Sequence, residues 1–210
     1  MKRKNVPRQR DAARTRDALI EAARWLFTRH AYDQLGTRDI AERAGVDAAL
    51  VHRYFGTKEK LFAKAIEKAY TIVQYLGDTP LADMPARFAE LMIDSKKDRE
   101  RFDATMVLLR SASSSEVQKL LARGLEDDFI TPLADLLGGP QWRTRTAMTL
   151  AILAGFETLR SVLRNDALHQ PEARELLERA VRACLVGDGP PPTTAEPTTS
   201  SLRPSRVDAK

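Results

Sequence analysis

Side chains suited to binding a nucleic acid gather in one basic stretch of the chain, TRDIAERAGVDAALVHRYFGTKEKLF. The guanidinium of Arg53 can donate to guanine or to phosphate, and the small Ala48 and Ala49 allow close approach to a thymine methyl group. Threonine and lysine at expected helix starts offer phosphate free N–H groups and the positive end of a helix dipole. We therefore expect contacts to DNA from Thr37, Ala48, Ala49, Leu50, His52, Arg53, Tyr54, Thr57 and Lys58.

Two short helices must position these side chains. The pattern predicts a helix from Thr37 to Ala44, a left-handed turn at Gly45, and a helix from Ala48 to about Tyr54 that Asp47 caps. This is the helix-turn-helix motif, whose second helix enters a major groove about 12 Å wide. The alternative is an ordinary helical domain with the same geometry. The expected packing residues are Ile40, Ala41, Val46, Val51 and Phe55.

The charge of the chain is concentrated near its N-terminus. The net charge is +5, but residues 1–60 hold 14 Lys and Arg against 8 Asp and Glu, whereas the other 150 residues hold 20 against 21. This asymmetry favours a polyanionic partner for the first third, with nucleic acid preferred to a membrane surface. The alternative is a basic surface that is merely solvated.

Other chemistries find little support in the sequence. Cys184 is the single cysteine, so an intramolecular disulfide is excluded, and the three histidines show no metal-ligand spacing. No nucleophile–base pair or phosphate-binding glycine loop is visible, so we expect neither an enzyme nor a cofactor or metal site. No secretory signal or membrane span is visible, and a cytoplasmic location is expected.

The helical periodicity predicts an all-α protein. We expect a basic arm over residues 1–10, a DNA-binding domain over 11–57, a helical domain over 58–186 and a disordered tail over 187–210. The second domain should begin with one long helix from Lys58 to Leu76, and Pro132 should kink a later helix. The helices expected farther along run over 85–94, 99–111, 113–137, 141–164 and 171–186.

The stretch from Arg14 to Phe62 resembles the tetracycline-repressor (TetR) family of bacterial transcription regulators. The matching segments are ALIEAARWLF, TRDIAERAGV and ALVHRYFGTKEKLF. The resemblance implies phosphate contacts from Thr37 and Lys58, and base or phosphate contacts from Arg38, Ala48, Ala49 and His52. It also implies a C-terminal domain that dimerises and encloses an effector pocket.

Two residues depart from the family pattern. His52 stands where the family usually has tyrosine, so the usual phosphate contact there would come from an imidazole. A second interpretation of His52 is a solvated polar residue. Asp47 stands where a neutral cap is common, and it brings negative charge close to DNA.

The last two helices carry enough apolar surface for a twofold interface. The helix from Gln141 is apolar over much of its circumference, which requires burial on more than one side. The alternative is that both helices fill the core of their own subunit. The expected interface residues are Met148, Ala151, Ile152, Gly155, Phe156, Leu159, Leu177, Ala180, Val181 and Cys184.

A small-molecule pocket is expected among large, adaptable side chains in the second domain. Each of these side chains also fits ordinary core packing. The residues are Phe88, Met92, Phe102, Met106, Leu109 and Phe129.

Three functions remain open at this stage. The first is a repressor that a small-molecule effector releases from a palindromic operator, to which it binds as a homodimer. The second is an all-α enzyme or carrier with an incidental basic head. The third is a DNA-binding activator or architectural protein without an effector.

Overall fold

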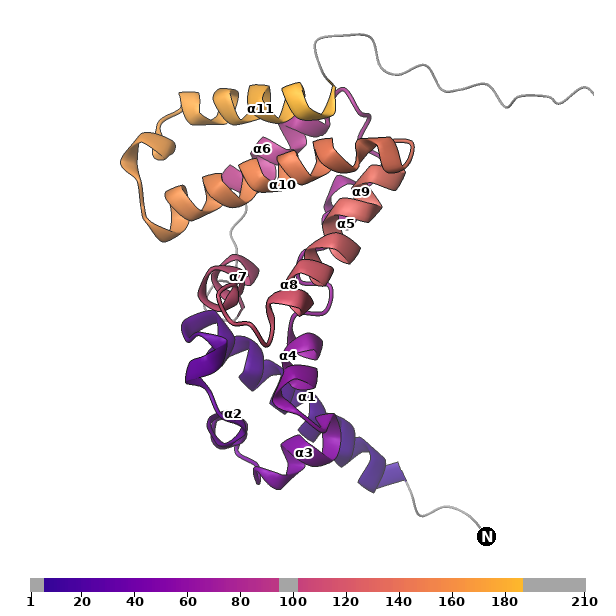
Figure 1. The fold of residues 1–210 in the computed structure, drawn as a ribbon, viewed down its shortest axis with the longest axis vertical. Coiled ribbons are helices and arrows are strands. Elements are labelled where there is room, and N and C mark those ends of the chain that lie inside the picture. Colours follow the sequence, from indigo (N-terminus) through magenta and orange to yellow (C-terminus); the bar gives the residue numbers. More distant parts are fainter. Residues whose placement is uncertain (1–5, 95–101, 187–210) are drawn as a thin grey trace, which may run out of the picture.

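Residues 6–65 form helices at one end of the molecule, called the head below, and a helical layer forms the other end (Figure 1). The structure is a computed structural model that describes residues 6–94 and 102–186, and all the regular elements within these ranges are helical. The expected all-α class is confirmed. The predicted tail over 187–210 lies outside the described residues. The α-helices are α1 (Val6–Arg29), α2 (Thr37–Ala44), α3 (Ala49–Phe55), α4 (Lys58–Ala65), α5 (Val73–Leu76), α6 (Met84–Asp94), α7 (Ala104–Ser111), α8 (Gln118–Leu125), α9 (Thr131–Leu136), α10 (Arg143–Glu157) and α11 (Glu172–Leu185).

Shorter helical turns connect these elements. Two of them are π-helical: η2 (Glu126–Ile130) follows α8, and η4 (Thr158–Val162) follows α10. The 3₁₀ turns are η1 (Tyr32–Gln34), η3 (Pro140–Trp142) and η5 (Asp166–His169).

The predicted helix pair forms as the sequence indicates. Gly45 ends α2 with φ of 68° and ψ of 34°, the left-handed conformation that glycine adopts at little cost. The Asp47 carboxylate then accepts a hydrogen bond of 2.7 Å from the backbone N–H of Ala49 at the start of α3. This glycine turn and the aspartate after it fix the angle at which α3 leaves α2.

Helix α1 begins earlier than the sequence suggested. We expected residues 1–10 to form an arm outside the helix, because Pro7 interrupts the hydrogen-bonding pattern. The helix instead starts at Val6, so Pro7 lies in its first turn. Proline is tolerated there because the N–H groups of a first turn have no intrahelical partner.

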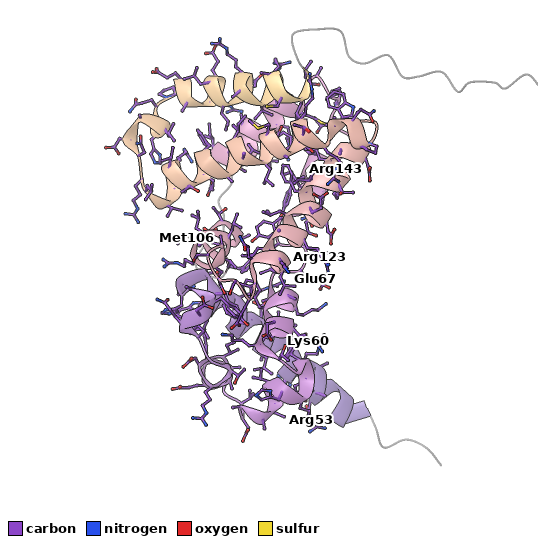
Figure 2. All side chains as sticks on the ribbon, in the orientation of Figure 1. Arg53, Lys60, Glu67, Met106, Arg123 and Arg143 are labelled. Atoms are coloured by element: carbon purple, nitrogen blue, oxygen red, sulfur yellow. The ribbon has the colours of Figure 1, made fainter. Side chains whose placement is uncertain are left out.

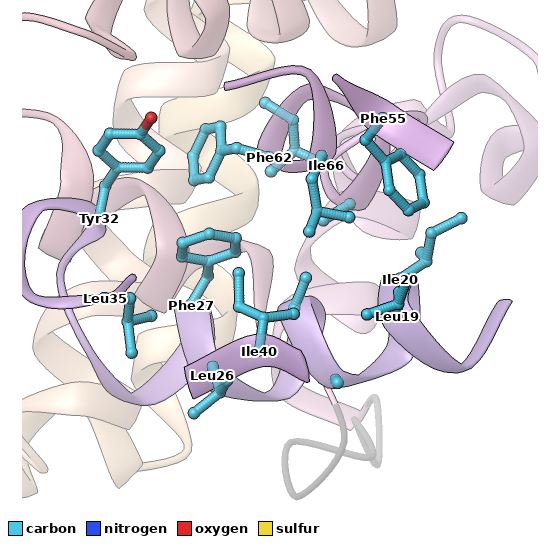
Figure 3. Packing of buried hydrophobic residues seen from close by; sticks show 14 of the residues in the cluster. Leu19, Ile20, Leu26, Phe27, Tyr32, Leu35, Ile40, Phe55, Phe62 and Ile66 are labelled. Carbon is cyan, nitrogen blue, oxygen red and sulfur yellow. The ribbon is translucent and has the colours of Figure 1, made fainter. Parts of the chain in front are cut away.

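The core of the head is centred on three aromatic side chains (Figure 3). Phe27, Tyr32 and Phe62 have ring centroids 4.9–5.9 Å apart, and all three are fully buried. The same core includes Val107, which belongs to α7, as well as Val117 and Leu121. The head is therefore packed partly by side chains from the region that follows it.

The predicted long helix after Thr57 is interrupted. Helix α4 ends at Ala65, Lys68 adopts a left-handed φ of 57°, and helix resumes only at Val73. The β-branched residues Thr71 and Ile72 disfavour helix, and the Arg24 Nε–H donates to the Ala65 carbonyl over 2.9 Å. The expectation of one rigid helix from Lys58 to Leu76 is wrong.

We expected Pro132 to kink its helix, but the structure has a π turn just before it. Helices α8 and α9 form one rod that continues through the π turn η2, which ends two residues before Pro132. Proline lacks an N–H group and its ring crowds the preceding turn, so a wider turn relieves the conflict. The Thr131 hydroxyl donates to Glu126, and Arg143 of α10 pairs with the same carboxylate at 2.6 Å.

Helices α6, α10 and α11 form the layer farthest from the head (Figure 1). The inner face of α10 is unusually polar, because Thr146, Thr149 and Glu157 are buried there with Leu153. Both threonine hydroxyls donate to carbonyl oxygens one turn earlier in α10, at 2.9 Å. From Met148 onward the outward-facing residues of α10 are apolar, so this part of the helix lacks the polar outer face of an ordinary surface helix.

Candidate nucleic-acid interface and ligand cavity

The exposed face of α3 contains fewer residues than expected. Ala49, His52 and Arg53 are exposed, and Arg53 lies at the tip of the head, at the opposite end from α10 and α11 (Figure 2). Leu50 and Tyr54 were expected on this face but lie half-buried against the head core. They share the inner side of the helix with Val51 and Phe55, which lie one residue away from them.

Helix α2 flanks this face with groups at its N-terminus. Gly36 occupies the cap position, and its N–H donates to the Asp39 carboxylate over 2.6 Å. Thr37, which stands at the expected helix start, is the first residue of α2. Arg38 is exposed beside it.

The structure directs Lys58 inward. Its Nζ donates to the carbonyl oxygens of Tyr32 and Leu35 at 3.2 and 3.0 Å, and lies 3.8 Å from the centre of the Tyr32 ring. The ammonium therefore holds the turn η1 against the start of α4. The phosphate contact implied for Lys58 has to compete with these interactions.

Two other basic side chains border α3 and were not singled out in the sequence. Lys60 is exposed one turn beyond Gly56, and its N–H donates to the Thr57 hydroxyl, which caps α4 as predicted. Arg16 of α1 is exposed and lies 5.4 Å above the Phe55 ring. Neither residue stands at a helix start, so the criterion used on the sequence did not select them.

A cavity of about 750 Å³ lies between the head and the outer helical layer. Its walls come from α1, the segment from Ala69 to Tyr75, α6, α7, α8 with η2, and α10. Of the side chains expected to line a pocket, Met92, Phe102 and Phe129 do so. The other wall residues include Leu91, Leu108, Leu125, Leu150, Leu153 and Ala154.

Three of the expected pocket residues lie elsewhere. Phe88 is fully buried behind the wall, with its ring centroid 6.3 Å from that of Phe129. Met106 and Leu109 are on a side of α7 that does not line the cavity, and Leu109 is 45% exposed. On α7 it is Ala104, Thr105 and Leu108 that face the cavity, as the helical period requires.

Several polar side chains of the cavity wall also form contacts between segments of the chain. The Tyr70 hydroxyl donates to the Ala104 carbonyl at 3.3 Å, and burial, together with the nearby Asp128 carboxylate, raises the pKa of Tyr70. Burial likewise raises the pKa of Asp128. From α1, Glu21 and Arg24 also line the cavity and are paired at 3.3 Å. A helix of the head thus forms one wall of the cavity.

The apolar face expected for dimerisation is only partly as predicted. Met148, Ala151 and Gly155 are exposed along α10, and Leu159 is exposed in η4. Ile152 and Phe156 are half-buried and pack against the core of their own chain.

On α11 the expected interface residues divide between two faces. Leu177 and Val181 are buried in the core of the same chain, so their assignment to an interface is wrong. Ala180 and Cys184 are half-buried, and Leu176, which we did not assign, is 57% exposed. The inner face of α11 packs against α6, which the sequence pattern alone did not reveal.

Two absences hold for residues 6–94 and 102–186. No group of three or more His, Cys, Asp or Glu residues there could hold a metal ion. No helix in these ranges is long and apolar enough to cross a membrane.

An exposed short helix, held by a glycine turn against a partner helix, is the architecture of helix-turn-helix DNA-binding proteins. A model described as "Bacterial regulatory proteins, tetR family" matches residues 19–65, and one described as "Tetracyclin repressor-like, C-terminal domain" matches residues 82–185. The chain belongs to the TetR family, and it is a DNA-binding transcription regulator.

Two curated relatives match part of the chain. The transcriptional repressor AcnR of Corynebacterium efficiens is 31% identical over 90 residues, which are 42% of this chain and 44% of AcnR. The transcriptional regulator BetI of Agrobacterium fabrum is 43% identical over 51 residues, which are 24% of this chain and 25% of BetI. The chain thus matches less than half the length of each.

Solved structures share the fold over most of the chain. The crystal structure of native NalD, the secondary repressor of the MexAB-OprM multidrug efflux pump in Pseudomonas aeruginosa, has a TM-score of 0.61 at 20% identity. The match covers 84% of this chain and 97% of NalD. At this identity the likeness concerns the fold.

Replacing Lys58 and replacing Lys60 should have different effects. Lys58→Ala should lower the free energy of unfolding by about 1–3 kcal/mol, because it removes charged hydrogen bonds to two carbonyl groups. Lys60→Ala should leave stability unchanged and reduce the salt dependence of DNA binding by about one ion. Urea unfolding and salt titrations of both variants check this. A Lys58→Ala protein as stable as the wild type would show that its inward contacts do not hold the turn.

Proposed function

We propose that the protein is a homodimeric repressor that binds a palindromic operator through α3 and is released by a small molecule bound in the cavity. The observation that carries the proposal is the exposed face of Ala49, His52 and Arg53 on a helix fixed by Gly45 and Asp47. Side chains of this size and type suit the base edges of the major groove. The repressor sign is supported by AcnR and NalD, both of which are named as repressors.

Dimerisation is supported by the apolar side chains exposed along α10 and η4. Met148 of α10 is 52% exposed, and Leu159 of η4, which continues from α10, is 45% exposed. Leu163, just after η4, and Leu176 of α11 are exposed by 66% and 57%. Apolar side chains gathered in this way mark an interaction surface.

Gly155 lies on the exposed face of α10, in its last turn. A Cβ atom at Gly155 would meet nothing within 4 Å in this chain, so the packing of the protomer does not require glycine there. Glycine inside a helix costs about 0.5–1 kcal/mol relative to alanine, and close approach of a second helix offsets that cost. A twofold pairing of α10 would place two copies of α3 on one duplex, which is the basis for a palindromic site.

Release by a ligand requires a path from the cavity to the head, and α7 is the element that supplies it. One side of α7 lines the cavity, and the other packs on α1 through the buried Val107. At its N-terminal end, the Asp103 N–H donates to the Thr28 hydroxyl over 3.1 Å. At its C-terminal end, the Ser111 hydroxyl accepts a bond of 3.2 Å from the Tyr32 N–H.

The interrupted α4 makes this path more important. The long helix predicted from Lys58 would have joined the two regions directly, but it breaks before it reaches the cavity wall at Ala69. A ligand that favours one position of α7 would act on η1 and α1 directly. It shifts the DNA-binding equilibrium only if it prefers one of the two positions.

The alternatives are less well supported. An activator or architectural protein without an effector would not need a cavity whose wall includes α1 and α7. A regulator rather than an enzyme is inferred from the family and from relatives named as regulators. Binding to a bacterial chromosome gives the protein a cytoplasmic location.

Selection of bound sequences from random DNA tests recognition by α3. The wild type should select a twofold-symmetric site, and Arg53→Ala should weaken that site by about 1–3 kcal/mol and relax one position in each half. Gel-shift titrations at several salt concentrations supply the affinities. No affinity for DNA even at low salt would remove the proposal.

A charge on the exposed apolar side of η4, which continues from α10, should separate the protomers. Leu159→Glu should dissociate the dimer and weaken operator binding, because the carboxylate would be buried between two apolar helices. Leu136→Glu is the matched control, since Leu136 is 46% exposed on α9. Sedimentation velocity gives the molecular mass. Dimers in both variants would place the interface elsewhere.

Filling the cavity should abolish the response to a ligand. Compounds that raise the melting temperature of the wild type in a thermal-shift screen should fail to stabilise Ala154→Trp, whose indole occupies the cavity. Leu109→Trp, on a side of α7 that does not line the cavity, should respond like the wild type. Equal responses from both variants would exclude the cavity as the effector site.

A further inference from the structure

His52 is held by an interaction that decides which hydrogen-bonding group it presents. Its Nδ1 lies 3.0 Å from the carbonyl oxygen of Gly56. A carbonyl oxygen only accepts hydrogen bonds, so Nδ1 must carry the proton. In the neutral ring Nε2 is then bare, and it is a hydrogen-bond acceptor.

The backbone at Gly56 is shaped to keep this contact. Gly56 has φ of 78° and ψ of −59°, close to the rare γ-turn conformation that glycine tolerates far better than other residues. The Gly56 N–H also donates to the His52 carbonyl at 2.9 Å. His52 and Gly56 are thus joined by two hydrogen bonds of opposite direction at the end of α3.

This tautomer changes what His52 can recognise. A bare Nε2 cannot donate to a phosphate oxygen, so the phosphate contact expected at this position is unfavourable for the neutral ring. In the major groove the base-edge donors are the exocyclic amino groups, N6 of adenine and N4 of cytosine. His52 is exposed between Ala49 and Arg53, within the face proposed to meet DNA.

We propose that His52 is a specificity-determining residue that accepts a hydrogen bond from the amino group of an adenine or a cytosine in each operator half-site. This rests on the proposed recognition of DNA by α3. The inference concerns base preference at one position in each half-site, and it leaves overall affinity to the basic residues. Gly56 is the positioning residue that holds the imidazole in the required tautomer.

The first test needs no DNA. Long-range ¹H–¹⁵N spectra of the full-length protein report the protonation of both ring nitrogens of each histidine, and His52→Gln assigns the signal. We expect a protonated Nδ1 and a bare Nε2 for His52. A ring protonated at Nε2 alone would overturn the proposal, whatever the protein does with DNA.

The second test measures the base preference at each operator position. In selection from random DNA, His52→Ala should lose the preference for adenine or cytosine at one position per half-site, by about three- to tenfold, and keep the others. Replacing that base by an analogue without its amino group should weaken the wild type and leave His52→Ala unaffected. Arg53→Ala, the control, should lose a different position.

Two outcomes of the second test would overturn the inference. If His52→Ala weakens all sequences alike and lowers the salt dependence, His52 contacts a phosphate as a donor. If it changes no position, His52 is only a solvated residue. If the wild type selects no sequence at all, the proposed function fails, while the spectra still report whether the tautomer is correct.

Discussion

The turn η1 is the point at which the head is held together. Tyr32 is fully buried between the rings of Phe27 and Phe62, and its carbonyl accepts a hydrogen bond from Lys58. Its N–H donates to Ser111 of the following region. The link between α1 and α2 is thereby joined both to α4 and to α7. The angle of the helix-turn-helix pair depends on this turn, because α2 begins three residues after η1 ends.

The same contacts explain how a movement in the cavity wall could be passed on to α3. The head core contains side chains from α7 and from the segment that begins α8, so these helices cannot move without disturbing it. Closely packed interiors move between discrete arrangements and do not deform continuously. Two positions of α7, rather than a gradual bend of α4, are therefore the natural states between which an effector would select.

Local sequence rules predicted the head well. The glycine turn, the Asp47 and Thr57 caps and the buried faces of α2 and α3 follow from residue type and helical period, so they need no knowledge of the partner helices. Faces shared between elements were harder to predict. Leu177 and Val181 look like interface residues from α11 alone, but α6, distant in sequence, covers them. The inward direction of Lys58 depends on carbonyl groups of a turn 23 and 26 residues earlier, which no local pattern indicates.

The outward apolar face of α10 has a consequence for how the regulator exists in a cell. In the proposed dimer, each chain completes its burial of apolar surface only by meeting a second copy, so folding and assembly become one equilibrium. The concentration of folded dimer then rises more steeply than the total concentration of the chain. At low concentration, a newly synthesised chain would expose this apolar face to proteases and chaperones. The regulator would then have a threshold of expression below which it does not accumulate.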